Sequence, residues 1–207
     1  MAGLAYVGSG VLGSAVAVTD GCSQGRYSEV GARLAAEWLV SAAPAKWRAA
    51  QERPAPFVRS LCRGLSRLVH DLAGRFGPRP VPDVVAELFL FTFLVAVVGR
   101  RRAAVVGVGD GVVMVDGRVT VLDAGPDNAP PYVAYDVVGA AHAAAPRVHY
   151  AGPADAFDSL VIATDGAVDL SLEEFATAPK YRRNTSLVHK RLRVLSRERC
   201  LADDTTV

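Results

Sequence analysis

The sequence is poor in the residues that mark a disulfide framework or a zinc module. It has three cysteines, Cys22, Cys62 and Cys200, which lie far apart and include no Cys-x-x-Cys pair. An odd number of widely spaced cysteines supports neither a disulfide framework nor a zinc ribbon. This usage fits a reducing compartment, so we expect a cytoplasmic protein.

Long hydrophobic runs are also missing. The most apolar stretch, Leu88 to Val98, contains Thr92 and is followed by three arginines. It has about half the length that a membrane-spanning helix needs, so we interpret it as a buried strand that ends at the surface. No basic and then apolar leader opens the chain, and we therefore expect neither a signal peptide nor a membrane partner.

The chain has almost no surplus of charge of either sign. The formal net charge is +2, with 21% charged and 51% apolar residues. This composition excludes a disordered chain. The length of 207 residues is enough for a sizeable core, so we expect residues 1–207 to form a single domain. A balanced charge indicates neither the presence nor the absence of a nucleic-acid partner.

Two helices are predicted in the first part of the chain, after a strand over residues 14–19. Ser28 can cap the first helix, and Pro44 is expected to end it. Its buried face is predicted from apolar residues four apart, Val30, Leu34, Trp38 and Ala42. The second helix has a clearer apolar stripe and should begin near Pro54 and Pro56 and end at Gly77-Pro78. The stripe consists of Phe57, Leu61, Leu65, Leu68 and Leu72.

The chain changes character from Leu88 onward. Runs rich in Val, Leu and Phe predict strands over residues 88–98, 103–108, 112–115 and 118–122. Asp116-Gly117 is a two-residue hairpin turn, so the strands beside it are antiparallel. A further strand is expected over residues 158–164, and a basic, weakly periodic segment spans residues 180–199. A strand, two helices, a strand meander and a final helical segment indicate an antiparallel α+β fold.

Two apolar runs each end just before an Asp-Gly pair. Ala15-Val16-Ala17-Val18 precedes Asp20-Gly21, and Leu160-Val161-Ile162-Ala163 precedes Asp165-Gly166. A strand fixes the carboxylate, while glycine allows a sharp turn that brings its carbonyl close to a ligand. Several such carboxylates at one rim can hold hard divalent cations. A plain turn is the alternative interpretation of any single Asp-Gly pair.

The full set of these motifs resembles one family. Asp20-Gly21-Cys22-Ser23, Gly109-Asp110-Gly111, Asp127-Asn128, Asp165-Gly166 and Asp203-Asp204-Thr205-Thr206-Val207 occur in the order and spacing of the metal-dependent protein phosphatases of type 2C, bacterial branch. The resemblance implies a four-layer α-β-β-α sandwich of two antiparallel sheets flanked by helices. It also implies a serine/threonine phosphatase that acts in signalling on phosphorylated proteins with Mn²⁺ or Mg²⁺, through a metal-bridging hydroxide.

The resemblance also implies a ligand set for two or three ions. Asp20 would bridge two ions, the carbonyl of Gly21 would bind the second, and Asp165 and Asp203 would complete the first. These three aspartates are the expected catalytic residues, with Asp204 as the alternative to Asp203. Asp110 and Asp169 would hold a weaker third ion together with Asp165, and a solvated turn carboxylate is the alternative for each of these two.

The sequence departs from the family pattern in three places. Residues 1–13 contain no acidic residue or arginine, although the family carries both on a strand before the Asp-Gly strand. Cys22 stands where better-known members have a histidine that acts as general acid. The last strand stops after the Asp-Asp-Thr-Thr-Val motif. We therefore expect a chain shortened at both ends, without the N-terminal strand, that binds metal weakly and turns over slowly.

Three other functions are weighed against this one. A phosphatase-like regulatory or binding module without turnover fits the missing arginine. A thiol mechanism at Cys22 is disfavoured because no histidine accompanies it, so activity should survive alkylation. Residues 180–199 are basic, but they contain a single aromatic residue, Tyr181, and so lack platforms for stacked bases. We expect a monomer without a nucleic-acid partner.

Overall fold

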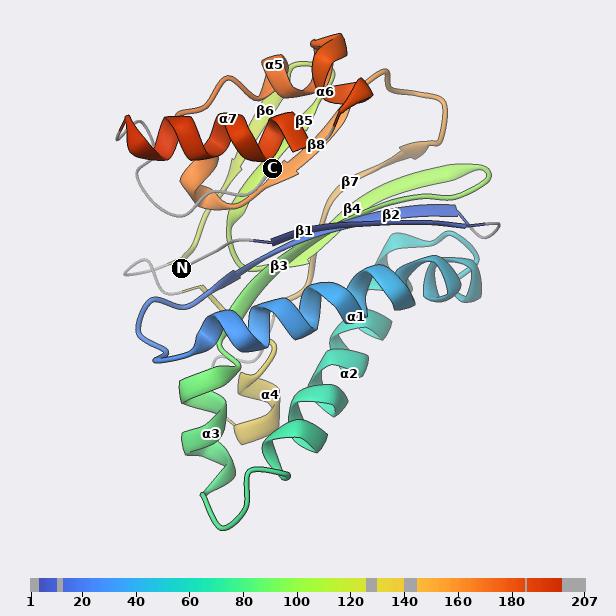
Figure 1. The fold of residues 1–207 in the computed structure, drawn as a ribbon. Helices are drawn as coiled ribbons and strands as arrows, with labels where there is room; N and C mark the ends of the chain where they lie inside the picture. The colour runs from blue at the N-terminus through green and yellow to red at the C-terminus, as the bar shows by residue number, and fades with distance from the viewer. Residues whose placement is uncertain (1–3, 11–12, 126–129, 140–144, 185, 199–207) are drawn as a thin grey trace.

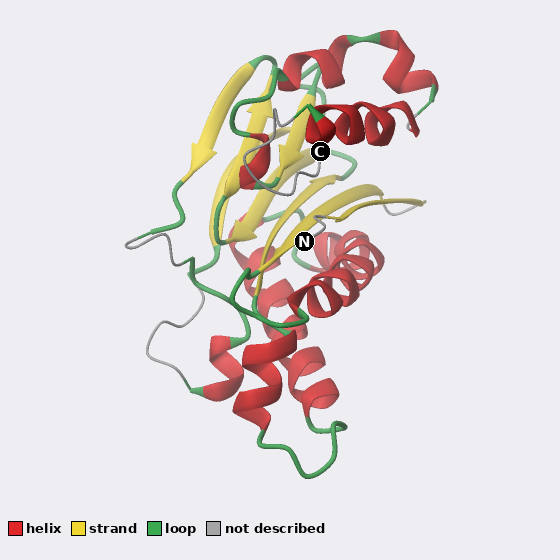
Figure 2. Cartoon of the chain, turned by 60° about the vertical axis from the view of Figure 1, so that its left-hand side comes forward, coloured by secondary structure: helices red, strands yellow, loops and turns green. Residues whose placement is uncertain are grey.

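Two antiparallel sheets lie face to face, with a helical layer on each outer side (Figure 1). The computed structural model describes residues 4–10, 13–125, 130–139, 145–184 and 186–198. Figure 2 shows the strands of both sheets between the two groups of helices. The predicted α-β-β-α sandwich is thus confirmed.

The first sheet has five strands in the order β1-β2-β3-β4-β7, all antiparallel. They are β1 (Leu4–Gly10), β2 (Gly13–Gly21), β3 (Phe91–Val98), β4 (Arg102–Val108) and β7 (Arg147–Pro153). The expectation of a missing N-terminal strand is wrong, because β1 pairs with β2 from Leu4↔Thr19 to Gly10↔Gly13. The segment is glycine-rich, a weak strand signal, and its hairpin partner β2 supplies the hydrogen bonds that order it.

The second sheet has three strands in the order β6-β5-β8. They are β5 (Gly111–Val115), β6 (Arg118–Leu122) and β8 (Leu160–Ala163). The hairpin at Asp116-Gly117 is confirmed, with φ of 48° and 79° at its two turn residues. The prediction of one continuous strand meander is wrong, because β4 and β5 belong to different sheets. The chain crosses from one sheet to the other at residues 109–110.

The helices beside the first sheet are α1 (Ser28–Ala49), α2 (Pro54–Ala73), α3 (Val81–Leu88) and α4 (Tyr135–Val138). Two predictions for α1 are wrong. The helix continues through Pro44, and Val30 and Leu34 are 43% and 38% exposed. The buried face is instead built largely from small residues that let the helix approach the sheet closely, Gly31, Ala32, Ala35, Ala36 and Ala43, together with Leu39 and Trp47.

The second helical layer consists of α5 (Leu172–Thr177), α6 (Pro179–Arg183) and α7 (Ser186–Arg197). It includes most of the basic segment expected over residues 180–199. Leu192 and Leu195 of α7 are buried in the cluster that joins this layer to the second sheet. No helix in the described part of the chain combines the length and the apolar character needed to span a membrane.

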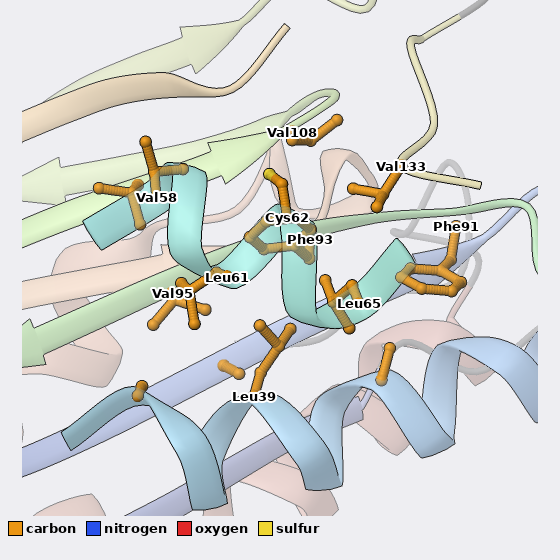
Figure 3. Packing of buried hydrophobic residues seen from close by; sticks show 14 of the residues in the cluster. Leu39, Val58, Leu61, Cys62, Leu65, Phe91, Phe93, Val95, Val108 and Val133 are labelled. Carbon is orange, nitrogen blue, oxygen red and sulfur yellow. The ribbon is translucent and has the colours of Figure 1, made fainter. Parts of the chain in front are cut away.

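Three apolar clusters join the four layers. The largest lies between α1–α4 and the first sheet, where Leu61 and Leu65 of α2 pack with Leu39, Phe93 and Val95 (Figure 3). The predicted stripe of α2 is confirmed: Phe57, Leu61 and Leu65 are fully buried, and Leu68 and Leu72 pack partly buried beside them. A second cluster joins the two sheets through Val18, Leu94, Ala96, Val105, Val113 and Ile162. Since the central strands β3, β4 and β5 are buried on both faces, functional groups are expected at strand ends.

Candidate metal centre

Asp20 lies at the end of β2, where the strand register fixes its position. It pairs with Thr92 of β3, and Gly21 pairs with Phe91. Asp20 is half-buried, whereas Thr92 is 6% exposed. The carboxylate therefore stands at the rim of the sandwich, on a strand held between two neighbours.

Asp110 reaches the same rim from the crossover between the sheets. Val108 pairs with Phe93, and one further step of this register places Gly109 opposite Thr92. The contact is close, since a Cβ atom at Gly109 would lie 2.3 Å from Cγ2 of Thr92, and φ is +97°. Only glycine fits there without strain. Asp110 follows directly and is half-buried.

Asp165 lies beside Asp110, at the same end of the neighbouring strand. Val112 of β5 pairs with Ala163 of β8, and two further steps of this antiparallel register place Asp110 opposite Asp165. Burial and the charge of Asp165 raise the pKa of Asp110 above its ordinary value of 3.8, while backbone and Thr92 hydrogen bonds act in the opposite direction. Two carboxylates that repel each other at a strand end favour a cation between them.

Asp165 also begins a short 3₁₀ turn, Asp165–Ala167. The backbone N–H of Gly166 donates to its Oδ1 at 2.9 Å, which orients the carboxylate. Asp169 follows the turn and is exposed. Asp203, its alternative Asp204, and Asp127 of the predicted motif lie outside the described residues.

The turn after Asp20 is fixed from both sides. The N–H of Cys22 donates to the carbonyl of Leu90 at 2.9 Å, and Oγ of Ser28 donates to the carbonyl of Cys22 at 2.7 Å. Gly21 packs against Ser28, and a Cβ atom there would lie 2.8 Å from the Ser28 hydroxyl. Ser28 is therefore not the predicted N-cap, since Tyr27 holds that position. Its hydroxyl holds the Asp20-Gly21-Cys22 turn instead.

Two tyrosines lie on the side of the site near Cys22. Tyr132 shares a hydrogen bond with the Cys22 side chain, and burial together with this bond raises the pKa of Tyr132. The Tyr135 ring meets the Tyr132 ring edge to face, with 5.3 Å between centroids. Cys62, in contrast, lies in the core, and burial raises the pKa of its thiol to about 12, which makes it unreactive.

Sequence reasoning missed three residues that support the site: Thr92, Ser28 in its observed role, and Tyr132. Thr92 was visible as a polar residue in an otherwise apolar strand, which is a signal for a buried hydroxyl with a partner. Tyr132 follows a sequence stretch, residues 123–131, that has no hydrophobic periodicity, so no pattern indicated that it would approach Cys22.

The structure brings Asp20, Asp110 and Asp165 to one rim. Within the described residues, no three histidine, cysteine, aspartate or glutamate residues form a group close enough to hold a metal ion. A complete site therefore needs further oxygen donors, such as a main-chain carbonyl or water. The chemistry of the donors fits Mg²⁺ or Mn²⁺, because every candidate ligand is a hard oxygen and the Asp110–Asp165 pair carries unfavourable charge.

The sequence profile of the family "Protein phosphatase 2C" matches residues 5–203. The chain belongs to the protein phosphatase 2C family. Solved structures agree in fold. The serine/threonine phosphatase Stp1 from Staphylococcus aureus superimposes with a TM-score of 0.59 and 13% identity, over 84% of this chain and 74% of that one.

A bacterial serine phosphatase gives a TM-score of 0.57 at 13% identity, covering 84% of this chain and 76% of that one. The serine/threonine phosphatase of S. agalactiae gives 0.51 at 13% identity, over 82% and 75%. No curated protein matches the chain. At such identities the likeness concerns the fold, and the family membership makes the chain a protein phosphatase, a hydrolase of phosphoproteins.

Proposed function

We propose that this chain is a metal-dependent serine/threonine phosphoprotein phosphatase that works with Mn²⁺ or Mg²⁺. The observation that supports the proposal is the strand register, in which Asp20, Asp110 and Asp165 stand at three strand ends on the same rim. When bound, two divalent cations supply an activated water and neutralise charge on the phosphoryl oxygens.

The residues of the rim have distinct proposed roles. Asp20 has two carboxylate oxygens and would bridge two ions, with the carbonyl of Gly21 beside it. Asp165 would share one ion with Asp203 or with Asp204. Asp110 and Asp169 would hold a third, weaker ion together with Asp165. Asp20, Asp110 and Asp165 stand at the ends of paired strands, which favours catalysis because oriented charges need not reorganise when the phosphoryl group reacts.

The surrounding residues hold the ligands in position. The Thr92 hydroxyl donates to Asp110, and Ser28 ties the turn that carries Gly21. Cys22 occupies the place where better-known family members have a general acid. Its neighbour Tyr132 holds its own proton tightly, since its pKa is raised. We infer that water protonates the leaving group in this chain.

We further propose that residues 1–207 form one phosphatase-like domain that acts as a monomer in the cytoplasm, in signalling opposite a protein kinase. Its substrate would be a phosphorylated protein and not a nucleic acid or a membrane component. Neither the fold nor the family match favours a phosphatase-like module without turnover.

Hydrolysis of a chromogenic phosphate monoester tests the proposed function. Turnover should appear with Mn²⁺, disappear with a chelator, and be lost in Asp20→Asn. Asp155→Asn is the matched control, because Asp155 is an exposed carboxylate near the opposite end of the sandwich. Turnover that persists in the chelator, or that Asp20→Asn leaves unchanged, would contradict the proposal.

A further inference from the structure

Strand β6 forms a free edge of the second sheet. The strand order is β6-β5-β8, so β6 pairs with β5 on one side, and no other described strand pairs with its outer side. The residues from Arg118 to Val121 are exposed, and Leu122 is half-buried. A free edge presents unpaired backbone N–H and C=O groups in a row, which is a template for one more strand.

Two valines make this edge apolar. Val119 and Val121 are 49% and 55% exposed. Their partners on β5 are Met114 and Val112, which are buried in the cluster under the α5–α7 layer. Paired residues of antiparallel strands lie on the same side of a sheet, so the helical layer covers β5 on this side and stops short of β6. The valines are therefore free to pack against the side chains of an added strand.

Strand β7, at an edge of the first sheet, is protected against such pairing. It carries an extra residue, His149, where its register with β4 shifts, and it ends at Pro153. A bulge and a proline are devices that stop an edge from pairing with another chain. The register of β6 with β5 is regular over all five residues, and β6 has neither proline nor charge from Val119 to Leu122.

The charges around β6 lie at its two ends. Arg118 at the hairpin end and Asp123, just beyond the rim end, are both exposed. Asp116 is close to Arg118, but its carboxylate accepts N–H groups on the β8 side. Arg147 is exposed at the start of β7, at the rim end of the first sheet. Since neither sign prevails, binding along β6 depends on main-chain hydrogen bonds and apolar contact, which select an extended polypeptide over a nucleic acid or an anionic lipid surface.

The β6 edge leads to the proposed metal centre. Leu122, the last residue of β6, pairs with Gly111, which directly follows Asp110. Leu122 also packs against the cluster between the two sheets, which anchors this end of the strand. A strand added to β6 would lie two strand spacings, roughly 10 Å, from the chain that carries Asp110. The residue of that strand just beyond Leu122 would therefore lie at the rim.

The length of the edge favours a segment over a second folded chain. A stable interface between folded chains buries about 1,200–2,000 Å², for which a ladder along the five residues of β6 is short. Two copies of β6 paired about a two-fold axis would also place each rim end beside the hairpin end of the other copy. An extended segment needs only the main-chain pairing that a few residues supply.

We propose that the β6 edge docks an extended segment of the phosphoprotein substrate as an additional antiparallel strand, with the phosphorylated residue at the rim. Because β6 runs towards the rim, an antiparallel segment runs away from it, so the docked residues follow the phosphorylated residue in sequence. This inference rests on the proposed phosphatase function and adds how that function selects its substrates.

Binding of a labelled phosphopeptide tests the proposal without turnover. The probe has a phosphothreonine followed by five residues that alternate threonine and valine, and its fluorescence anisotropy is measured with a chelator present. Two further versions carry N-methyl groups on one or the other alternate set of residues in this stretch. Because alternate residues of a strand point their N–H groups in opposite directions, one version should lose binding and the other should keep it.

The protein variant Val119→Gln/Val121→Gln keeps the charge and removes two apolar contacts. Peptide binding should weaken about tenfold. The matched control Val148→Gln/Val194→Gln changes two valines that are 43% and 41% exposed elsewhere, and it should bind like wild type. With Mn²⁺ present, the ratio of kcat/KM for the phosphopeptide to kcat/KM for a small chromogenic ester should fall by the same factor in the β6 variant.

Four results would overturn the proposal. The peptide does not bind, both N-methylated versions bind alike, the β6 variant binds as wild type does, or wild type forms a concentration-dependent dimer that the β6 variant abolishes. The first three remove strand addition, and the fourth assigns the edge to a second copy of the chain. A wild-type chain without turnover of the small ester would instead contradict the proposed function, so the two failures are distinguishable. Equal melting temperatures of the variants separate a binding defect from unfolding.

Discussion

The two ends of β5 carry the same dipeptide in opposite surroundings. Asp110-Gly111 opens the strand and Asp116-Gly117 closes it. The Asp116 carboxylate is exposed and accepts the backbone N–H groups of Asp158 and Ser159 at 2.9 and 2.8 Å. Asp110 is half-buried and faces the charge of Asp165. Hydrogen-bond donors stabilise the negative charge of Asp116. Asp110 instead lies next to a second negative charge, that of Asp165, which a bound cation would neutralise.

This difference shows that the groups next to an Asp-Gly pair decide whether the pair can contribute to a metal site. The hairpin end of the second sheet is completed by its own main chain. The rim end leaves two carboxylates opposed, an arrangement that the folded protein keeps at a cost in electrostatic energy. Substitutions at the two ends should therefore have opposite consequences for turnover and for stability.

The largest contrast is expected in turnover. Asp165→Asn removes a carboxylate charge from the proposed metal centre and should lower Mn²⁺-dependent hydrolysis of a chromogenic phosphate ester by at least about a hundredfold. Asp116→Asn should leave turnover unchanged, because the carboxylate of Asp116 binds the Asp158–Ser159 segment at the hairpin end, away from the rim. Steady-state kinetics of the two variants measure the contrast. Equal loss in both would show that the ends do not differ in function.

The hairpin end should matter for stability instead. Asp116→Ala removes the acceptor that joins the β5–β6 turn to the chain before β8, and it places alanine at φ of 48°. We expect a loss of about 1–2 kcal/mol in the free energy of unfolding, from the lost bonds and the left-handed backbone. Urea denaturation measures the loss. Asp116→Asn should recover most of it, since asparagine tolerates this conformation and keeps one acceptor.

Thr92 offers a test of how the rim is positioned. Thr92→Val keeps the shape of the side chain but removes the hydroxyl that donates to Asp110. We expect turnover at saturating Mn²⁺ to fall by about tenfold, the effect of one lost charge-assisted hydrogen bond. The concentration of Mn²⁺ at half-maximal activity should rise as well. A purely structural role would instead lower the melting temperature without changing the metal requirement.

A smaller effect is expected in the metal-free protein. The raised pKa of Asp110 means that the folded chain holds this proton more tightly than the unfolded chain does. Its contribution to stability is therefore present below the ordinary pKa and is lost as the pH rises through the raised value. The side chain in Asp110→Asn cannot ionise, so the variant does not lose this stability as the pH rises. The metal-free variant should therefore have a higher melting temperature than wild type at pH 7 and the same melting temperature at acid pH.

Saturating Mn²⁺ should reverse the order at pH 7, because the ion stabilises the wild-type carboxylate and not the amide. Differential scanning calorimetry with and without metal measures both cases. A variant that melts below wild type in the absence of metal would show that Asp110 is held by favourable contacts, as Asp116 is.

The parts of the fold that the sequence predicted are those specified by local chemistry. Leu61 and Leu65 of α2 follow the helical period, because only a helix brings all the apolar residues of this stripe onto one buried face. The Asp116-Gly117 turn needs two residues with positive φ, which this dipeptide supplies. The α+β class and the strand ends at Asp20 and Asp165 followed from the same kind of pattern.

The errors arose where distant contacts decide the structure. On α1, close packing against the sheet selects small residues, so Val30 and Leu34 remain outside although their period is helical. The glycine-rich β1 is ordered by pairing with β2, and its own composition indicates little. The division of β4 and β5 between two sheets depends on positive φ at Gly109 and Gly111, which hydrophobic periodicity does not report.

Calorimetric titration with Mn²⁺ tests most directly whether the rim carboxylates form a metal centre. Wild type and Asp116→Asn should bind Mn²⁺ with the same affinity and stoichiometry at neutral pH, whereas Asp165→Asn should bind fewer ions or bind them at least about tenfold more weakly. Circular dichroism of the three proteins should be the same, so that a difference in binding reflects the ligand and not the fold. If Asp165→Asn binds Mn²⁺ as wild type does, the rim is not the metal centre.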